Sequence, residues 1–325
     1  MMNIIAVGPV ESPCLSVEIL ASPNSLYNTP MPGILYALIT VFAWGTWLTP
    51  SQNIPFRNQQ IKTFYVAAAN LALALLVLLI RGAEGLTWAV FWPPFLGGLV
   101  WAVSGFLAFT GTNRLGMARA FGIWAPVNVL VSILWGVLLF GELIHDGPQR
   151  LALFALALVI ALTGVLLIIF AKGLRSSGPA DPHARAGLWA AVGAGVLWGS
   201  YFIPVQLSAA SMWVAAFPLA VGIFVGSALL AAFTRQPLRL DHPSHYARVL
   251  STGLLWGIGN YGMLLLVGEF GAGRGFTISQ LGIVVNGLMG VYLLKDPPPK
   301  SRAAALTLIG CVLATLGGIL MGGGK

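Results

Sequence analysis

Long apolar runs without a charged residue dominate this chain, and short polar segments carrying its Lys, Arg, Asp and Glu residues separate them. The runs that are most clearly delimited are 63–80, 120–141, 151–171, 249–268, 275–294 and 303–324. Most of them approach or exceed the ~20 residues that an α-helix needs to cross a bilayer. The pattern therefore predicts transmembrane helices.

Four further spans complete the pattern. One run ends before Arg57, and another lies between Glu84 and Arg114. The run 186–234 is about twice the length of a single span, so we expect two helices joined by a tight turn near residues 207–211. The predicted fold is an all-α integral membrane protein with ten transmembrane helices.

The sequence also repeats itself. Segment 33–52 matches segment 187–206, and the pairs 98–101 with 253–256, 118–123 with 273–278, and 135–142 with 289–296 follow at nearly the same spacing. Because each repeat holds an odd number of spans, the second half must enter the membrane from the opposite side. We therefore expect a 5+5 inverted-topology repeat: a disordered tail (1–32), a first repeat (33–172), a cytoplasmic linker (173–186) and a second repeat (187–325).

The basic residues set the expected orientation. Thirteen of the 17 Lys and Arg residues fall on one predicted face of the membrane, and the opposite face has Arg81, Arg150, Arg274 and Lys325. Lys and Arg accumulate in cytoplasmic loops. The first face is therefore predicted to be cytoplasmic, with both termini outside the cytoplasmic (inner) membrane.

Composition narrows the function. Hydrophobic residues make up 58% of the chain and charged residues only 8%, against about 25% charged residues in soluble domains. The formal charge of +8 does not indicate nucleic-acid binding, because the basic residues stand singly between apolar runs. The histidines lie in loops, and His, Asp, Glu and Lys do not cluster within the spans. No metal, cofactor or enzymatic activity is therefore predicted.

A Trp-Gly-Thr/Ser-x-x-x-Pro motif occurs once in each half, as Trp44 to Pro50 and as Trp198 to Pro204. A proline removes the backbone hydrogen bond to the carbonyl four residues earlier. We therefore expect free carbonyls at Thr46 and Ser200. Helices interrupted at matching places point to a transporter binding site, where Trp44 and Trp198 should meet near the midplane. The alternative is a pair of packing aromatics on kinked helices.

These motifs resemble a known family. The Trp-Gly-Thr/Ser segments, and Ala125-Pro126-Val127 followed by Gly141-Glu142, are similar to the drug/metabolite transporter superfamily. The segments 255–262 and 115–117 resemble its glucose/ribose porter and rhamnose transporter branches. The resemblance covers about residues 33–322 and implies a central cavity lined by spans 1, 3, 4, 6, 8 and 9. The implied substrate-binding residues are Trp44, Thr46, Trp101, Trp124, Asn128, Trp198, Ser200, Trp256, Asn260 and Gln280.

The ends of spans 4 and 9 carry the expected gates. If these spans are antiparallel neighbours, Arg119 can pair with Asp296 on the cytoplasmic face, and Arg274 with Glu142 outside. Pro50 and Pro204 would bend the chain towards opposite faces. The alternative is four unpaired interfacial charges, because exposed ion pairs contribute little.

The predicted function is secondary transport of a neutral sugar, or a related polyhydroxy solute, by alternating access. Coupling to protons through Glu142 or Glu269 stays open against facilitated diffusion. The alternative is transport of another metabolite, such as an amino acid. A membrane enzyme or a receptor is disfavoured by the absence of a polar cluster and by the short loops. The expected partners are the solute and the lipid bilayer, and the sequence does not define the oligomeric state.

Overall fold

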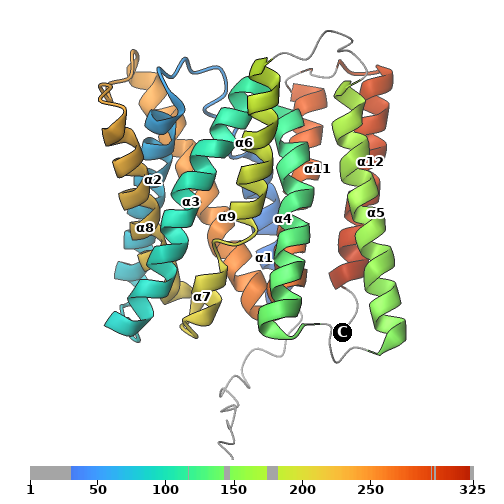
Figure 1. Cartoon of the computed structure of the whole chain (residues 1–325), viewed down its shortest axis with the longest axis horizontal. Helices are drawn as coiled ribbons and strands as arrows, with labels where there is room; N and C mark the ends of the chain where they lie inside the picture. The colour runs from blue at the N-terminus through green and yellow to red at the C-terminus, as the bar shows by residue number, and fades with distance from the viewer. Residues whose placement is uncertain are drawn as a thin grey trace, which may run out of the picture.

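A computed structural model describes residues 31–115, 117–142, 147–173, 182–293, 295 and 298–322. Within these ranges the chain is helical and contains no strand, and the helices stand roughly parallel in one bundle (Figure 1). They are α1 (Met31–Thr46), α2 (Gln59–Arg81), α3 (Trp88–Leu115), α4 (Met117–Phe140), α5 (Pro148–Gly173), α6 (Pro182–Trp198), α7 (Ile203–Leu207), α8 (Met212–Phe233), α9 (Pro243–Phe270), α10 (Ala272–Ser279), α11 (Gly282–Leu288), a π-helical turn (Met289–Leu293) and α12 (Arg302–Gly322).

Eight of the described helical segments are long and apolar enough to cross a membrane. Two of these eight segments consist of consecutive helices. One is α6 with α7 (Arg185–Leu207), and the other is α10 with α11 and the π-helical turn (Ala272–Leu293). The apolar parts of α1 and α12 are shorter. Many large apolar side chains point outwards, such as Leu79 and Phe233, which only a lipid environment makes favourable. The chain is therefore a multi-pass membrane protein.

The bundle has a lower and an upper end. The lower end, at the bottom of Figure 1, is where α1 begins and α4 ends, and the upper end is where α5 ends and α6 begins. The expected turn between the two helices of run 186–234 is confirmed, since α7 ends at Leu207 and α8 begins at Met212. The upper end is the one for which the basic residues predict a cytoplasmic position.

Proline does not mark every helix break. Pro126 lies inside the continuous helix α4, whereas the run 275–294 is interrupted after Ser279 without any proline. Around this break the hydroxyls of Thr277 and Ser279 donate to the carbonyls of Gly273 and Phe276. Bonds of this type also occur within the continuous helices α2 and α3, so they accompany this break without explaining it.

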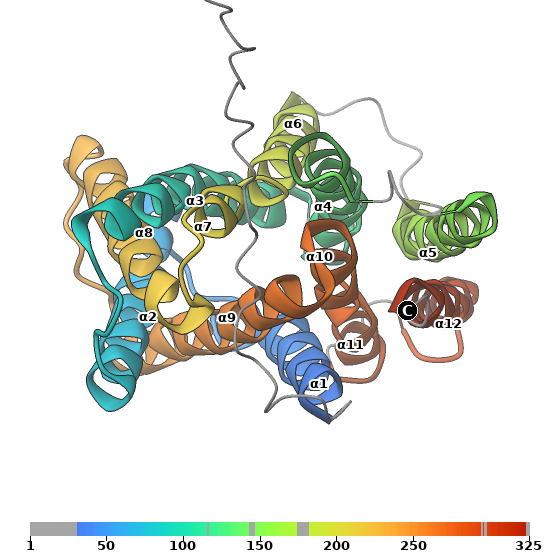
Figure 2. The same ribbon diagram turned by 90° about the horizontal axis from the view of Figure 1, so that it is seen from below.

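Helix packing follows a paired scheme. Helix α3 packs on α8 and on α6, and α9 packs in the corresponding way on α2 and on α1. Helix α4 packs on α6, and α11 packs on α1. Helices α5 and α12 pack on each other and stand together at one side of the bundle (Figure 2).

Glycines make the closest of these approaches. A Cβ atom on Gly98 of α3 would lie 2.2 Å from the Leu219 carbonyl oxygen of α8, and one on Gly253 of α9 would lie 2.4 Å from the Val66 carbonyl oxygen of α2. No other residue fits where backbones touch in this way. The glycines of the two Trp-Gly motifs also lie tightly against a neighbouring helix. A Cβ atom on Gly45 would clash with α11, and one on Gly199 would clash with α4.

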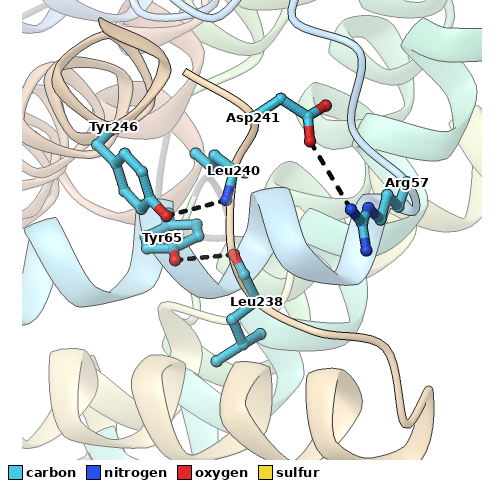
Figure 3. A network of polar contacts seen from close by, with 6 residues as sticks. All are labelled: Arg57, Tyr65, Leu238, Leu240, Asp241 and Tyr246. Carbon is cyan, nitrogen blue, oxygen red and sulfur yellow. Dashed lines mark hydrogen bonds and ion pairs between the residues drawn. The ribbon is translucent and has the colours of Figure 1, made fainter. Parts of the chain in front are cut away.

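The loop between α8 and α9 is fastened to α2 at the upper end (Figure 3). The Tyr65 hydroxyl donates to the Leu238 carbonyl at 2.9 Å, and the Tyr246 hydroxyl accepts from the Leu240 N–H at 2.9 Å. Arg57 and Asp241 form an exposed ion pair at 3.7 Å, which stabilises the loop only weakly. The tyrosines therefore hold this loop more firmly than the charges do.

Candidate functional site

A small aromatic cavity lies between the helices of the bundle. It is lined by Trp44, Trp47, Trp101, Phe121, Trp124, Asn128, Trp198, Tyr201, Trp256, Phe276 and Gln280. Its volume is about 30 Å³, on a scale where one water needs ~10–15 Å³. The aromatic side chains have thus closed on one another, and the cavity must widen before it holds a solute of several carbon atoms.

The structure brings seven of the ten expected binding residues to this cavity: Trp44, Trp101, Trp124, Asn128, Trp198, Trp256 and Gln280. Asn260 lies behind the wall, where its Oδ1 accepts from the Tyr201 hydroxyl at 2.7 Å. The six helical segments named by the resemblance supply the lining. Which of these residues touch the solute stays a prediction.

Thr46 and Ser200 are not among the lining residues. The Thr46 hydroxyl donates to the Phe42 carbonyl and the Ser200 hydroxyl to the Val196 carbonyl, each one turn back in its own helix. The role of these two residues in binding stays a prediction, but the expectation that their carbonyls are free is wrong. The Thr49 N–H donates to the Thr46 carbonyl at 3.0 Å, and the Ile203 N–H donates to the Ser200 carbonyl at 3.1 Å. A tight turn after each Trp-Gly segment thus replaces the bond that proline removes.

Four lining residues were not anticipated: Trp47, Phe121, Tyr201 and Phe276. A signal for them exists in the sequence. Trp47 and Tyr201 occupy equivalent positions three residues after Trp44 and Trp198, hence on the same helix face if the helix continues. Phe121 and Phe276 match in the repeated segments 118–123 and 273–278. Aromatic residues that recur at equivalent positions would have identified all four.

The tryptophans form a connected wall. Trp101 is central, with its ring centroid 4.4 Å from that of Trp256 and 6.2 Å from that of Trp198. Trp256 stacks on Trp44 at 6.4 Å, and Trp124 meets Trp198 edge-on at 5.1 Å. Trp44 and Trp198 therefore face one cavity, with Trp101 and Trp256 between them. Such faces suit the C–H surfaces of a sugar ring as well as other flat apolar surfaces.

Two amide side chains add polarity at the cavity edge. The Asn128 Nδ2 donates to Gln280 Oε1 at 3.3 Å, joining α4 to the break between α10 and α11. With its amide turned over, Asn128 instead donates to the carbonyls of Trp124 and Gly195. Neither amide carries a charge, and no carboxylate or cation is among the lining residues in the part of the chain that the structure describes. The cavity therefore suits a neutral solute better than an ion.

Two phenylalanine rings and the Glu142 carboxylate join helices at the lower end. Phe202 and Phe276 stack at 4.7 Å with an interplanar angle of 17°, and both are fully buried. The Glu142 carboxylate accepts hydrogen bonds from the backbone N–H groups of Ala272 at 2.5 Å and Gly273 at 2.9 Å. A carboxylate is favoured there by the dipole of α10.

The predicted gating pairs have different outcomes. Glu142 contacts the two residues immediately before Arg274 through their backbone, so the ends of α4 and α10 do meet, and the charge pair stays a prediction. Asp296 and the side chain of Arg119 lie outside the described residues. Pro50 lies in the turn after α1 and Pro204 in the first turn of α7, near opposite ends.

Arg248 of α9 is a residue that sequence reasoning missed at the upper end. Its guanidinium donates to the Pro50 carbonyl at 2.8 Å and to the Gln52 carbonyl at 2.5 Å. It thereby fixes the turn that follows the first Trp-Gly segment to the start of α9. A backbone target of this kind leaves no pattern in the sequence, so the charge alone could not reveal it.

Helices of membrane length that surround an aromatic cavity with amide side chains define a class of multi-pass membrane proteins. The sequence pattern of the family described as "Sugar transport protein" matches residues 35–323. The chain therefore belongs to this family of sugar transporters.

Individual relatives agree with this assignment. A protein of Enterococcus faecalis named for sugar uptake is 27% identical, over 89% of this chain and 98% of its own length. One from Lactiplantibacillus plantarum with the same name is 26% identical over the same shares. A Priestia megaterium protein named for glucose uptake is 24% identical over 72% of this chain and 79% of its own. A crystal structure matches with a TM-score of 0.64 at 22% identity, covering 89% of this chain and 95% of that one, which supports the fold.

Proposed function

We propose that this protein moves a neutral sugar across the cytoplasmic membrane by alternating access, with the solute held in the aromatic cavity. The observation that carries the proposal is the enclosed wall of tryptophans with amides and without charge, in a chain of the sugar transport family. Stacking contributes about 1 kcal/mol and each net hydrogen bond about 1 kcal/mol. Four such contacts reach the roughly −4 kcal/mol of a millimolar affinity, which is adequate for a transporter.

The proposal includes ten membrane crossings in two inverted halves of five. Its support is the paired packing scheme, in which α3 with α8 and α6 corresponds to α9 with α2 and α1. The close approaches of Gly45 to Val285 and of Gly199 to Val131 correspond in the same way. Two halves of opposite orientation can exchange conformations, so that the cavity opens first to one side and then to the other. The charge distribution favours termini on the outside.

Transport into proteoliposomes tests the proposal directly. Purified protein should take up radiolabelled glucose, ribose or rhamnose with saturation, and an excess of the unlabelled sugar should compete. Liposomes without protein are the control. Uptake of a neutral amino acid or an amine, together with no uptake of any sugar, would overturn the assignment. The same vesicles with and without an inside-alkaline pH gradient test proton coupling, for which Glu142 and Glu269 are the candidate carboxylates.

Glu142 is proposed to latch the lower end when the cavity is closed to that side. Glu142→Ala removes the carboxylate that caps α10, a change that costs ~0.5–2 kcal/mol at a helix N-terminus. We expect the equilibrium to shift about tenfold towards opening at the lower end, since 1.4 kcal/mol corresponds to a factor of ten. The measurement is the labelling rate of Asn128→Cys, with Cys14 and Cys311 replaced, by a membrane-impermeant maleimide added to that side.

Glu84→Ala is the matched control, because Glu84 is an exposed carboxylate between α2 and α3 at the same end. Its removal should leave the labelling rate unchanged. Equal labelling of Glu142→Ala and the parent protein would contradict the latch.

A further inference from the structure

Two indole N–H groups in the cavity wall have no hydrogen-bond acceptor among the described residues. They belong to Trp101, which is fully buried, and to Trp198, which is 6% exposed. The N–H of a buried tryptophan usually finds a partner, because an unpaired buried donor is costly. Both side chains line the aromatic cavity, so a solute in that cavity is the partner within reach.

Trp44 provides the contrast within the same cavity. Its Nε1 donates to the Trp256 carbonyl oxygen at 3.1 Å, so this donor is already used. The bond depends on Gly259, where a Cβ atom would lie 2.2 Å from Trp44 Cδ1 and 2.5 Å from Trp44 Nε1. The missing side chain at this position lets the indole reach the α9 backbone. Trp44 is thereby held as part of the wall.

The corresponding position in the first half is Ser104, which follows Trp101 as Gly259 follows Trp256. The Ser104 hydroxyl donates to the Trp101 carbonyl oxygen at 2.8 Å and is fully buried. That carbonyl is the one that Trp198 would use if it behaved as Trp44 does. A hydroxyl already bonded there competes for the carbonyl, and serine has the Cβ atom that Gly259 lacks. Ser104 therefore keeps the Trp198 N–H available.

We propose that the indole N–H groups of Trp101 and Trp198 donate hydrogen bonds to two oxygen atoms of the transported solute, and that Ser104 is a positioning residue for Trp198. This inference rests on the proposed sugar transport and specifies its chemistry. The solute must be neutral and must present accepting oxygens to two donors, as the hydroxyl and ring oxygens of a monosaccharide do. A protonated amine brings only donors and meets no carboxylate among the lining residues.

The test compares the transported sugar with its single-deoxy derivatives in proteoliposomes. The wild-type protein should show about a tenfold higher KM for the deoxy sugars that lack an oxygen bound by an indole, as expected for one lost hydrogen bond. We call this increase in KM the deoxy penalty. Trp198→Phe keeps an aromatic ring and removes its N–H. In the Trp198→Phe variant the deoxy penalty for one of these sugars should fall to about twofold or less, because the donor is already absent. Trp101→Phe should abolish the penalty for a different oxygen.

Ser104→Gly tests the positioning role without touching either indole. It should let Trp198 bond to the Trp101 carbonyl, and so abolish the same deoxy penalty as Trp198→Phe. The double variant should lose nothing further. Ser132→Gly is the matched control, because the Ser132 hydroxyl is buried and donates to a carbonyl three residues back, as in Ser104, yet that carbonyl belongs to Val129, which is not among the lining residues of the cavity. Trp44→Phe should change KM for all the sugars alike.

The outcomes separate the two proposals. If the wild-type protein transports no sugar, the proposed function fails. If it transports a sugar, and Trp101→Phe and Trp198→Phe retain every wild-type deoxy penalty, the sugar function stands and the indole donors are refuted. Deoxy penalties that persist in Ser104→Gly but vanish in Trp198→Phe refute the role of Ser104 alone.

Discussion

Replacing Trp256 with alanine is expected to lower sugar uptake by about 100-fold. The Trp256 ring contacts Trp44, Trp101 and Tyr201, so its loss removes the centre of the cavity wall. Truncating a buried Trp costs ~3–5 kcal/mol of packing, and a loss of about 3 kcal/mol in the wall lowers the population of the binding-competent cavity by roughly 100-fold. The measurement is initial uptake into proteoliposomes, normalised to the amount of protein that elutes as a single species in size-exclusion chromatography.

Two variants show whether this loss is specific. Trp256→Phe keeps part of the aromatic surface and should retain about a tenth of the activity, because it loses less buried area. Trp189→Ala removes a tryptophan of α6 that is 65% exposed on the outer surface, and it should transport normally. If Trp256→Ala folds and transports like the parent protein, the aromatic cavity is not the solute site.

Gly98→Val is expected to destabilise the protein by about 2 kcal/mol or more. A Cβ atom at this position meets the Leu219 carbonyl oxygen at 2.2 Å and the Ile223 nitrogen at 2.5 Å, and backbone atoms cannot turn aside as a side chain can. Replacing Gly in a helix usually gains up to ~1 kcal/mol. Overpacking costs ~1–3 kcal/mol and occasionally more, so the clash outweighs the gain. The apparent melting temperature in detergent should fall, and Trp101, one turn further along α3, should lose its position.

Gly147→Val is the control for this substitution, because nothing lies within 4 Å of a Cβ atom there. Its melting temperature should match that of the parent protein. An unchanged melting temperature for Gly98→Val would mean that α3 and α8 are further apart than the structure has them.

The sequence was sufficient for the features that depend on hydropathy and repetition. The turn between α7 and α8 follows from span lengths, and the meeting of Trp44 and Trp198 at one cavity follows from matching segments. The hydrogen-bond partner of a small hydroxyl does not follow from hydropathy or repetition. Thr46 and Ser200 bond to their own helices because a local carbonyl is always within reach, whatever the repeat implies about the site.

Contacts to the backbone escaped prediction for a related reason. Arg248 binds the carbonyls of Pro50 and Gln52, and Glu142 binds the N–H groups at the start of α10. Charge complementarity in the sequence suggests side-chain partners only, since every residue has the same backbone. The break after Ser279 was likewise hidden, because no proline marks it.

The pair formed by α5 and α12 offers a reference frame for watching the transport cycle. The two helices pack on each other through small residues, with Gly164 against Ala314 and Gly317 against Ala161. They contribute no residue to the aromatic cavity. A spectroscopic label on an outward position of α12, such as Val312, would therefore stay still while the other helices rearrange. Distances from it to labels on α2 and α8 would report each conformation separately.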